Sequence, residues 1–229
     1  AQTDMNFEIG PGEAWCVCGS NRSGIAVLFE RLATGELSFQ HKTDIHPDQV
    51  GVVSFKEQQK LYEQELAKDQ TDLIDRIDPG TLAREFLTDI EAHGPLIHAF
   101  GLMPHLDQGY RQLSTGQSRK LLILSKITVG CRVLLLEAPY DGLDAKSRKE
   151  LDYALVHAFK GGTTIMIFVC NAADIPIWAT HIAVVRKNSV QHRGPYQRMM
   201  PQIQQLLEVK SDGVRLLAEE LKPVPDDYS

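Results

Sequence analysis

The sequence predicts an α/β fold with a mostly parallel sheet that is covered by helices and carries an inserted helical subdomain. Three observations support this. Continuous apolar runs alternate with helical patterns, as they do when parallel strands are buried on both faces. From Lys56 to about Asp107 the pattern is helical, with no strand signal. The 229 residues are enough for one large domain with such an insertion.

The first elements are a strand, a helix and a second strand. "EAWCVCGS" (13–20) predicts a short buried strand that ends at Gly19, and "GIAVLFERLATGE" (24–36) predicts the helix that follows it. "DQVGVVSF" (48–55) alternates apolar and polar residues, which is typical of a strand.

The insertion is expected to contain two helices. They are "KEQQKLYEQELAKD" (56–69) and "TLAREFLTDIEAHG" (81–94), interrupted by the turn signals "DPG" and "HGP".

The second half of the chain returns to the alternating pattern. Helices are predicted at 114–130 and 145–159, and apolar strands at 132–139 and 163–171. A final strand pair is predicted at 181–194. The tail holds one or two amphipathic helices and ends in a Pro- and Asp-rich stretch that is typical of a linker.

These elements predict three parts. An α/β core comprises 1–55 and 113–200, a helical subdomain comprises 56–112, and the tail comprises 201–229.

Bulk composition excludes several classes of protein. The net charge of −6 gives no basis for a nucleic-acid-binding surface. The longest uncharged apolar run, "TTIMIFVC", is far shorter than a membrane-spanning helix, and the N-terminus lacks the pattern of a cleavable signal. "CVC" is typical of a core strand, and the histidines lack zinc-type spacing, so no metal site is predicted. A reducing, cytoplasmic setting follows.

The stretch "GSNRSGIA" lies where a phosphate loop belongs, after a strand and at the start of a helix. Its glycines, Gly19 and Gly24, have the separation of the pattern G-x-x-x-x-G-K-[ST]. Ile25 stands where that pattern has lysine, and Ala26 stands where it has the hydroxyl that ligates Mg²⁺. Arg22 could fold back to supply a cation; the alternative is a solvated arginine.

Two further motifs follow at characteristic spacings. "LSTGQ" (113–117) opens a helix, and "VLLLEAPYDGLD" (133–144) joins an apolar strand to a turn. With the helical insertion before them, the three segments resemble the ATP-binding cassette (ABC) ATPases, which have a fold of the P-loop NTPase type. The resemblance spans residues 11 to 195. A closer resemblance, through "GSN.SG", "LSTG..RK", "PYDGLD..SR" and "VCNAADIP", is to the first half of tandem molybdate-transport or photorepair ATP-binding proteins.

The resemblance implies that the chain's own nucleotide site is degenerate. Glu137 takes the place of the metal-facing aspartate, Ala138 that of the catalytic glutamate, and Asn171 that of the switch histidine. Phe55 or Gln58 falls where a metal-contacting glutamine is expected. Because the catalytic positions are replaced, we expect this site to be deficient in hydrolysis. The degenerate site comprises Gly19, Ser20, Asn21, Arg22, Ser23, Gly24, Ile25, Ala26 and Glu137.

The signature motif is better preserved. In this family two cassettes pair head to tail, and each signature closes over the nucleotide that the other holds. The signature positions are Leu113, Ser114, Thr115, Gly116 and Gln117, with threonine replacing the usual glycine at the third. The resemblance implies that Gly142, Leu143 and Asp144 are the D-loop positions. Taken alone, "LSTGQ" reads as an ordinary capped helix start with Ser114 as the cap.

Two functions remain open. The first is the non-catalytic half of an asymmetric, transport-associated ABC ATPase, whose signature completes a partner's ATP site. The second is a scaffold domain that binds no nucleotide. A phosphate-loop kinase is disfavoured, because it too needs the missing lysine. The resemblance implies ATP and Mg²⁺ as cofactors, bound weakly at the chain's own site or shared with the partner's.

The implied partner is a competent ABC ATPase domain, a second copy in a head-to-tail dimer, or additionally a membrane permease. The implied location is the cytoplasm, including the inner face of a membrane.

Overall fold

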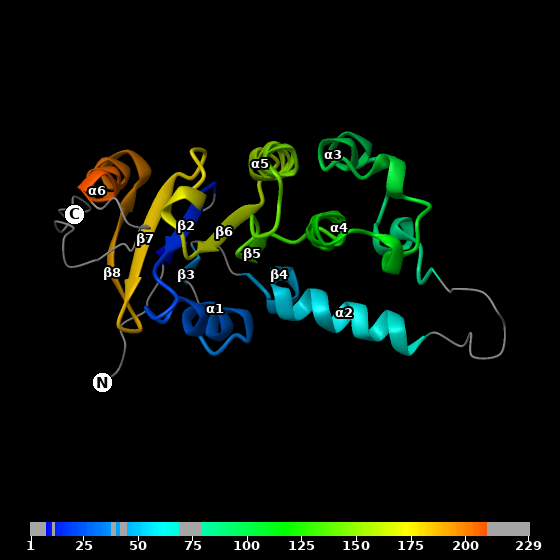
Figure 1. Ribbon diagram of the computed structural model, residues 1–229, viewed down its shortest axis with the longest axis horizontal. Coiled ribbons are helices and arrows are strands. Elements are labelled where there is room, and N and C mark those ends of the chain that lie inside the picture. Colours follow the sequence, from blue (N-terminus) through cyan, green and yellow to red (C-terminus); the bar gives the residue numbers. More distant parts are fainter. Residues whose placement is uncertain (1–7, 11, 38–39, 42–44, 69–78, 210–229) are drawn as a thin grey trace. The chain divides into compact units, whose positions relative to one another are not determined.

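The computed structural model describes residues 8–10, 12–37, 40–41, 45–68 and 79–209 (Figure 1). A six-stranded sheet has the strand order β4-β5-β6-β2-β7-β8. Its members are β2 (Ala14–Cys18), β4 (Val50–Val53), β5 (Val133–Glu137), β6 (Thr164–Val169), β7 (His181–Arg186) and β8 (Ser189–Pro195). Strand β2 pairs in parallel with both β6 and β7, and β8 returns antiparallel to β7. The predicted α/β class with a mostly parallel sheet is confirmed.

The chain divides into two compact units. Unit 1 comprises residues 1–47, 135–139 and 164–229, and unit 2 comprises residues 48–134 and 140–163. The predicted division into core, helical subdomain and tail stays a prediction. No helix within the described ranges has the length and apolarity needed to cross a bilayer.

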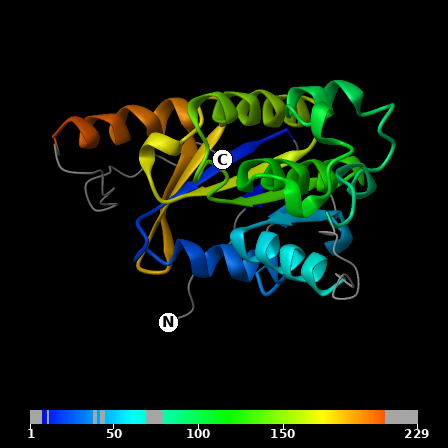
Figure 2. The ribbon, with the colours of Figure 1, turned by 45° about the vertical axis from the view of Figure 1, so that its right-hand side comes forward.

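Unit 1 has helices on both faces of its strands. Helix α1 (Ile25–Ala33) lies on one face and α6 (Tyr196–Val209) on the other, in both views (Figures 1 and 2). Phe29 of α1 meets Phe168 of β6 edge to face, with ring centroids 5.1 Å apart. Because both faces are covered, all five residues of β2 are buried. A small second sheet pairs β1 (Glu8–Ile9) with β3 (Gln40–His41).

The cysteine pair of β2 belongs to this core, as predicted. Cys16 and Cys18 are free thiols and are fully buried. Burial raises the pKa of Cys16 well above its ordinary value and that of Cys18 to about 12. Both side chains therefore behave as small apolar groups.

Unit 2 is largely helical. Helix α4 (Thr115–Thr128) lies between α5 (Ala145–Lys160) and α2 (Phe55–Ala67) in both views (Figures 1 and 2). Ser54 begins α2 by accepting a hydrogen bond from the N–H of Glu57, so β4 ends two residues before the predicted strand does. The short α3 (Gly94–Ala99) contacts α5.

The helix predicted at 81–94 is wrong. In this range the 3₁₀ turn η3 (Ala83–Phe86) forms, the backbone of Leu87 is extended, and α3 begins only at Gly94. The cause is a tertiary pairing: the N–H groups of Ala83 and Arg84 donate to the carbonyls of Gln108 and Leu106. These non-local bonds replace the helical ones that the local sequence favours.

Two further short turns precede α4. They are the 3₁₀ helices η4 (Met103–His105) and η5 (Tyr110–Gln112), and η5 leads directly into the segment that was predicted as the signature.

Candidate functional site

The predicted phosphate loop lies in unit 1, between β2 and α1. The N–H of Gly19 donates to the Val169 carbonyl over 3.2 Å, and the N–H of Ser23 donates to the Ser20 carbonyl over 2.8 Å. Gly24 has a φ of 93° and precedes the first helical residue, Ile25. The strand, turn and helix occur in the predicted order.

Both loop glycines are required by close packing within unit 1. A Cβ on Gly24 would lie 2.0 Å from Oδ1 of Asn188, in the turn between β7 and β8. The N–H of Asn188 also donates to the Ser23 carbonyl over 2.8 Å. A Cβ on Gly19 would lie 2.8 Å from the Val185 carbonyl oxygen. The spacing of the glycines thus has a reason that does not involve a phosphate.

The side chains of the loop offer little to an anion or a metal. Ile25 is only 3% exposed, so its position faces the core, and Ala26 is exposed but has no hydroxyl. The hydroxyl of Ser23 accepts a hydrogen bond from the N–H of Ile25 over 3.2 Å. Arg22 is exposed, and its guanidinium makes no ion pair within the described ranges. The predicted alternative of a solvated arginine fits this geometry.

The other substituted positions also lie in unit 1. Glu137 ends β5 and is half-buried. Ala138 follows with a φ of 42°, and its N–H donates to the Phe168 carbonyl. Oδ1 of Asn171 accepts from the N–H of Ala173 over 3.0 Å and so begins a 3₁₀ turn, η6 (Ala172–Asp174). A methyl group at 138 cannot act as a general base.

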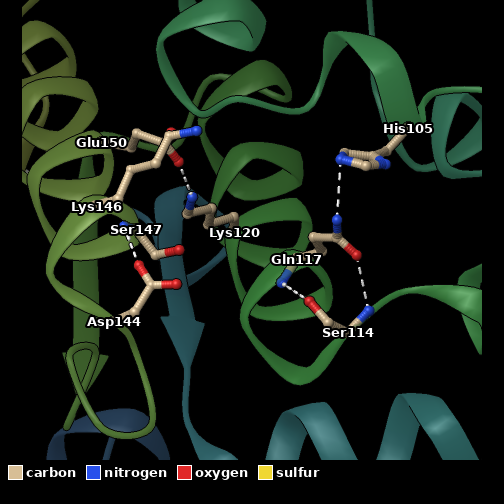
Figure 3. Close-up of polar contacts among 8 residues, drawn as sticks. All are labelled: His105, Ser114, Gln117, Lys120, Asp144, Lys146, Ser147 and Glu150. Carbon is tan, nitrogen blue, oxygen red and sulfur yellow. Dashed lines mark hydrogen bonds and ion pairs between the residues drawn. The ribbon is translucent and has the colours of Figure 1, made fainter.

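The predicted signature lies in unit 2, where it begins α4. Ser114 and Gln117 cap each other: Oγ of Ser114 accepts from the N–H of Gln117 over 3.2 Å, and Oε1 of Gln117 accepts from the N–H of Ser114 over 2.8 Å (Figure 3). Ser114 and Thr115 are exposed, whereas Leu113, Gly116 and Gln117 are half-buried. The first turn of α4 is therefore ordered while its end stays accessible.

A buried glutamine supports this turn from α2. Nε2 of Gln58 donates to the Thr115 carbonyl over 2.9 Å and to Oγ of Ser118 over 2.6 Å. Because the Thr115 carbonyl can only accept, it fixes the orientation of the Gln58 amide. Phe55, the other candidate for a metal-contacting glutamine position, starts α2 with 64% of its surface exposed. Gln58 thus serves the signature helix here.

The predicted D-loop begins α5 within the same unit. Oδ1 of Asp144 accepts from the N–H of Ser147 over 2.7 Å (Figure 3). This bond, with a second from the Ser147 hydroxyl, lowers the pKa of Asp144, so the exposed carboxylate is ionised at neutral pH.

Two buried cations join α4 to the D-loop and to α5. Nζ of Lys120 lies 2.5 Å from Oε2 of Glu150 (Figure 3). The guanidinium of Arg119 donates to the carbonyl of Asp141, just before Gly142. The signature and the D-loop are therefore held by one set of side chains.

Sequence reasoning missed several of these contributors. His105, Glu150 and Asn188 make their contacts, to Gln117, Lys120 and Ser23, only through the fold, so no local pattern marks them. Lys120 lies within "LSTG..RK", but that pattern does not predict its ion pair with Glu150. Among the described residues, no cluster of histidine, cysteine, aspartate and glutamate could hold a metal ion.

No protein-family model matches the chain. Individual curated proteins are nevertheless similar to the chain. The chain is 28% identical to the ABC transporter ATP-binding protein ModF of Escherichia coli over 231 residues, which cover 96% of this chain and 46% of ModF. It is 29% identical to the energy-coupling factor transporter ATP-binding protein EcfA2 of Streptococcus agalactiae over 170 residues, 72% of this chain and 57% of EcfA2. The chain thus spans about half the length of these relatives.

Solved structures agree on the fold. The structure of cbiO1 from Clostridium perfringens, part of the ABC transporter complex cbiONQ, has a TM-score of 0.62 at 20% identity, over 90% of this chain and 85% of cbiO1. The ADP conformation of MJ1267, an ATP-binding cassette of an ABC transporter, has a TM-score of 0.59 at 14% identity, over 87% of this chain and 86% of that one.

Proposed function

We propose that this chain, which belongs to the ATP-binding cassette family, is the non-catalytic half of an asymmetric, transport-associated ATPase. Its signature would complete an ATP site held by a partner. One observation carries the proposal: the signature helix begins with an ordered, accessible turn, whereas the loop of unit 1 lacks the side chains that nucleotide chemistry needs.

The residues of the chain's own loop do not fit Mg-ATP. A working loop uses a lysine on the β- and γ-phosphates and a hydroxyl on Mg²⁺. Here the lysine position holds the buried Ile25 and the hydroxyl position holds Ala26. Asn171 already uses its carbonyl oxygen on the N–H of Ala173, and Ala138 carries no carboxylate. This loop therefore has no group that could perform the catalytic step.

The signature retains the groups that bind a phosphate oxygen. Ser114 accepts through Oγ within its own turn, and its hydroxyl proton remains available for donation. The N–H groups of Thr115 and Gly116 belong to the first helical turn and have no intrahelical acceptor. The positive end of the dipole of the 14-residue helix α4 adds about 0.3–1 kcal/mol for an anion.

This arrangement favours a partner different from the chain itself. In a head-to-tail pair of identical chains, each signature would face a loop without lysine, so neither site would be competent. A competent cassette is needed, either in the other part of a longer protein or in a separate subunit. We place this assembly on the cytoplasmic side of a membrane, with a permease as a further partner.

The test is complementation between the wild-type chain and a variant of it. A loop-repaired chain carries Ile25→Lys, Ala26→Ser, Ala138→Glu and Asn171→His. A tester chain adds Ser114→Arg, which blocks its own signature. The wild type and the tester are each expected to be inactive alone, whereas their mixture should hydrolyse ATP. In the mixed dimer the tester provides the loop and the wild type provides the signature.

Binding measurements separate the two halves of the proposal. In calorimetry, the wild type should give no heat at millimolar Mg-ATP. Micromolar binding with hydrolysis by the wild type alone would refute the non-catalytic assignment. The loop-repaired chain could be active while the tester hydrolyses no ATP when it is mixed with the wild type. That result would refute complementation and favour the scaffold function.

A further inference from the structure

The imidazole of His105 lies against the signature turn although it is outside the motif. It ends η4, and its Nε2 is 2.9 Å from Nε2 of Gln117 (Figure 3). Its Nδ1 is 3.1 Å from Oε1 of Gln108. His105 and Gln117 are both half-buried. Residues 105 and 117 are 12 positions apart, so the contact depends on the fold.

The direction of each hydrogen bond follows from one fixed donor. The backbone N–H of Ser114 can only donate, and it donates to Oε1 of Gln117 over 2.8 Å. Nε2 of Gln117 then points to the histidine, and an amide nitrogen can only donate. Nε2 of His105 must therefore accept. Its proton is on Nδ1, where it is donated to Oε1 of Gln108.

We propose that His105 is a positioning residue for the signature. It holds the Gln117 carboxamide in the orientation that caps the N–H of Ser114, and so orders the residue expected to meet a partner's phosphate. The link to a phosphate rests on the proposed function, whereas the positioning itself does not.

The reciprocal cap between Ser114 and Gln117 explains why a change at His105 affects Ser114. Without an acceptor at 105, the Gln117 carboxamide loses the contact that fixes its rotation, and the Ser114 N–H loses its partner. The second bond, from the Gln117 N–H to Oγ of Ser114, is longer at 3.2 Å and does not hold the side chain of Gln117. Gln58 supports the same turn, but through Thr115 and Ser118.

The first test needs no partner. Two substitutions in the full chain separate the acceptor from the ring: His105→Phe keeps a planar ring without an acceptor, and His105→Gln keeps an acceptor oxygen. His98→Gln, at an exposed position on α3, is the control. Nitrogen-15 NMR should report the Nδ1–H tautomer of His105. Exchange of the Ser114 amide should accelerate about fivefold in His105→Phe, the factor expected for one lost cap.

The remaining variants decide the inference even if His105→Phe folds poorly. Ser114 exchange should stay at the wild-type rate in His105→Gln and His98→Gln. An Nε2–H tautomer in the wild type would overturn the proposal, and so would unchanged Ser114 exchange in a folded His105→Phe chain.

The second test uses the complementation assay. When each variant replaces the wild type in the mixture with the tester, turnover should fall about fivefold for His105→Phe and be restored by His105→Gln. Wild-type complementation with no loss in His105→Phe would contradict the positioning role. No complementation by the wild type, together with the expected Ser114 response, would instead remove the proposed function and leave the positioning role intact.

Discussion

Lys120 and Glu150 form an ion pair of 2.5 Å between Nζ and Oε2, and the two partners differ in burial. The Lys120 side chain is 6% exposed, whereas that of Glu150 is 30% exposed (Figure 3). Each residue lies six positions after a capping residue, Ser114 or Asp144. The pair therefore links the helix of the signature to the helix of the D-loop.

The two substitutions that break this pair should lower the free energy of unfolding by different amounts. Glu150→Gln leaves a buried ammonium without its countercharge and should lower the free energy of unfolding by about 2–4 kcal/mol. Lys120→Met leaves a carboxylate that water can reach, so its cost should be smaller. Urea unfolding measures both.

Lys146→Met is the matched control for the pair. Lys146 lies 3.9 Å from the same carboxylate but its side chain is 88% exposed, so its loss should cost less than about 1 kcal/mol. Equal costs for Lys120→Met and Glu150→Gln would contradict the argument from burial.

Gly24 should tolerate no side chain. An alanine there combines a φ of 93° with a Cβ 2.0 Å from Oδ1 and 2.7 Å from Cα of Asn188. We expect Gly24→Ala to lower the free energy of unfolding by about 3 kcal/mol, more than the ~1–2 kcal/mol of left-handed strain alone.

Gly162→Ala measures the cost of left-handed backbone strain without a steric clash. Gly162 has a φ of 100°, and a Cβ on it would meet no atom within 4 Å. Chemical denaturation of both variants gives the difference. If the two substitutions cost the same, the turn of Asn188 does not constrain the loop.

Glu65 should make stability depend on pH. Its side chain is fully buried, and its carboxylate accepts from Nζ of Lys68 over 2.6 Å and from the N–H of Thr81 over 2.7 Å. Burial alone would raise the pKa of Glu65, but these hydrogen bonds outweigh it and lower the pKa below 4.5. A lowered pKa contributes stability above the unfolded-state value, and that stability is lost as the pH falls through the folded-state value.

The measurement compares the wild type with Glu65→Gln. The substitution should cost about 1–3 kcal/mol at pH 7, and the difference should shrink as the pH falls below about 4.5. Glu63→Gln, on the exposed face of α2, should show no such trend. A difference that is constant from pH 7 to pH 3 would contradict the assignment.

Restoring the loop residues should lower the stability of the nucleotide-free chain, and Mg-ATP binding should recover part of that loss. Ile25→Lys replaces a buried apolar side chain in the first turn of α1, so we expect a loss of about 1–3 kcal/mol in the absence of nucleotide. Millimolar Mg-ATP should recover part of that loss in a thermal melt of the loop-repaired chain and none in the wild type. Recovery in the wild type would mean that its loop already binds ATP.

The sequence predicted most elements because their patterns are local. The helix expected at 114–130 spans 115–128, and the apolar strand expected at 163–171 spans 164–169. The helix expected at 81–94 failed because the backbone of Ala83 and Arg84 pairs with residues 106 and 108, which helical periodicity does not report.

The structure places the predicted motifs at the expected ends of elements: Ser114 begins α4, and Gly19 and Gly24 lie between β2 and α1. That these positions form a functional site stays a prediction. Gln58 and His105, which support the signature, lie 57 and 12 residues from their partners Thr115 and Gln117. The sequence marked Gln58 only for a metal contact and did not mark His105, so their contacts with the signature follow from the fold alone.

The substituted loop positions and the preserved motifs lie in different compact units. Positions 25, 26, 138 and 171 all belong to unit 1, and the signature, the D-loop and their supporting side chains all belong to unit 2. The hydrogen bonds and ion pairs that order Ser114 involve none of the four substituted positions. For protein engineering, we therefore expect that unit 1 can be edited without disturbing the order of Ser114, which is what a sensor or an orthogonal pair of subunits requires.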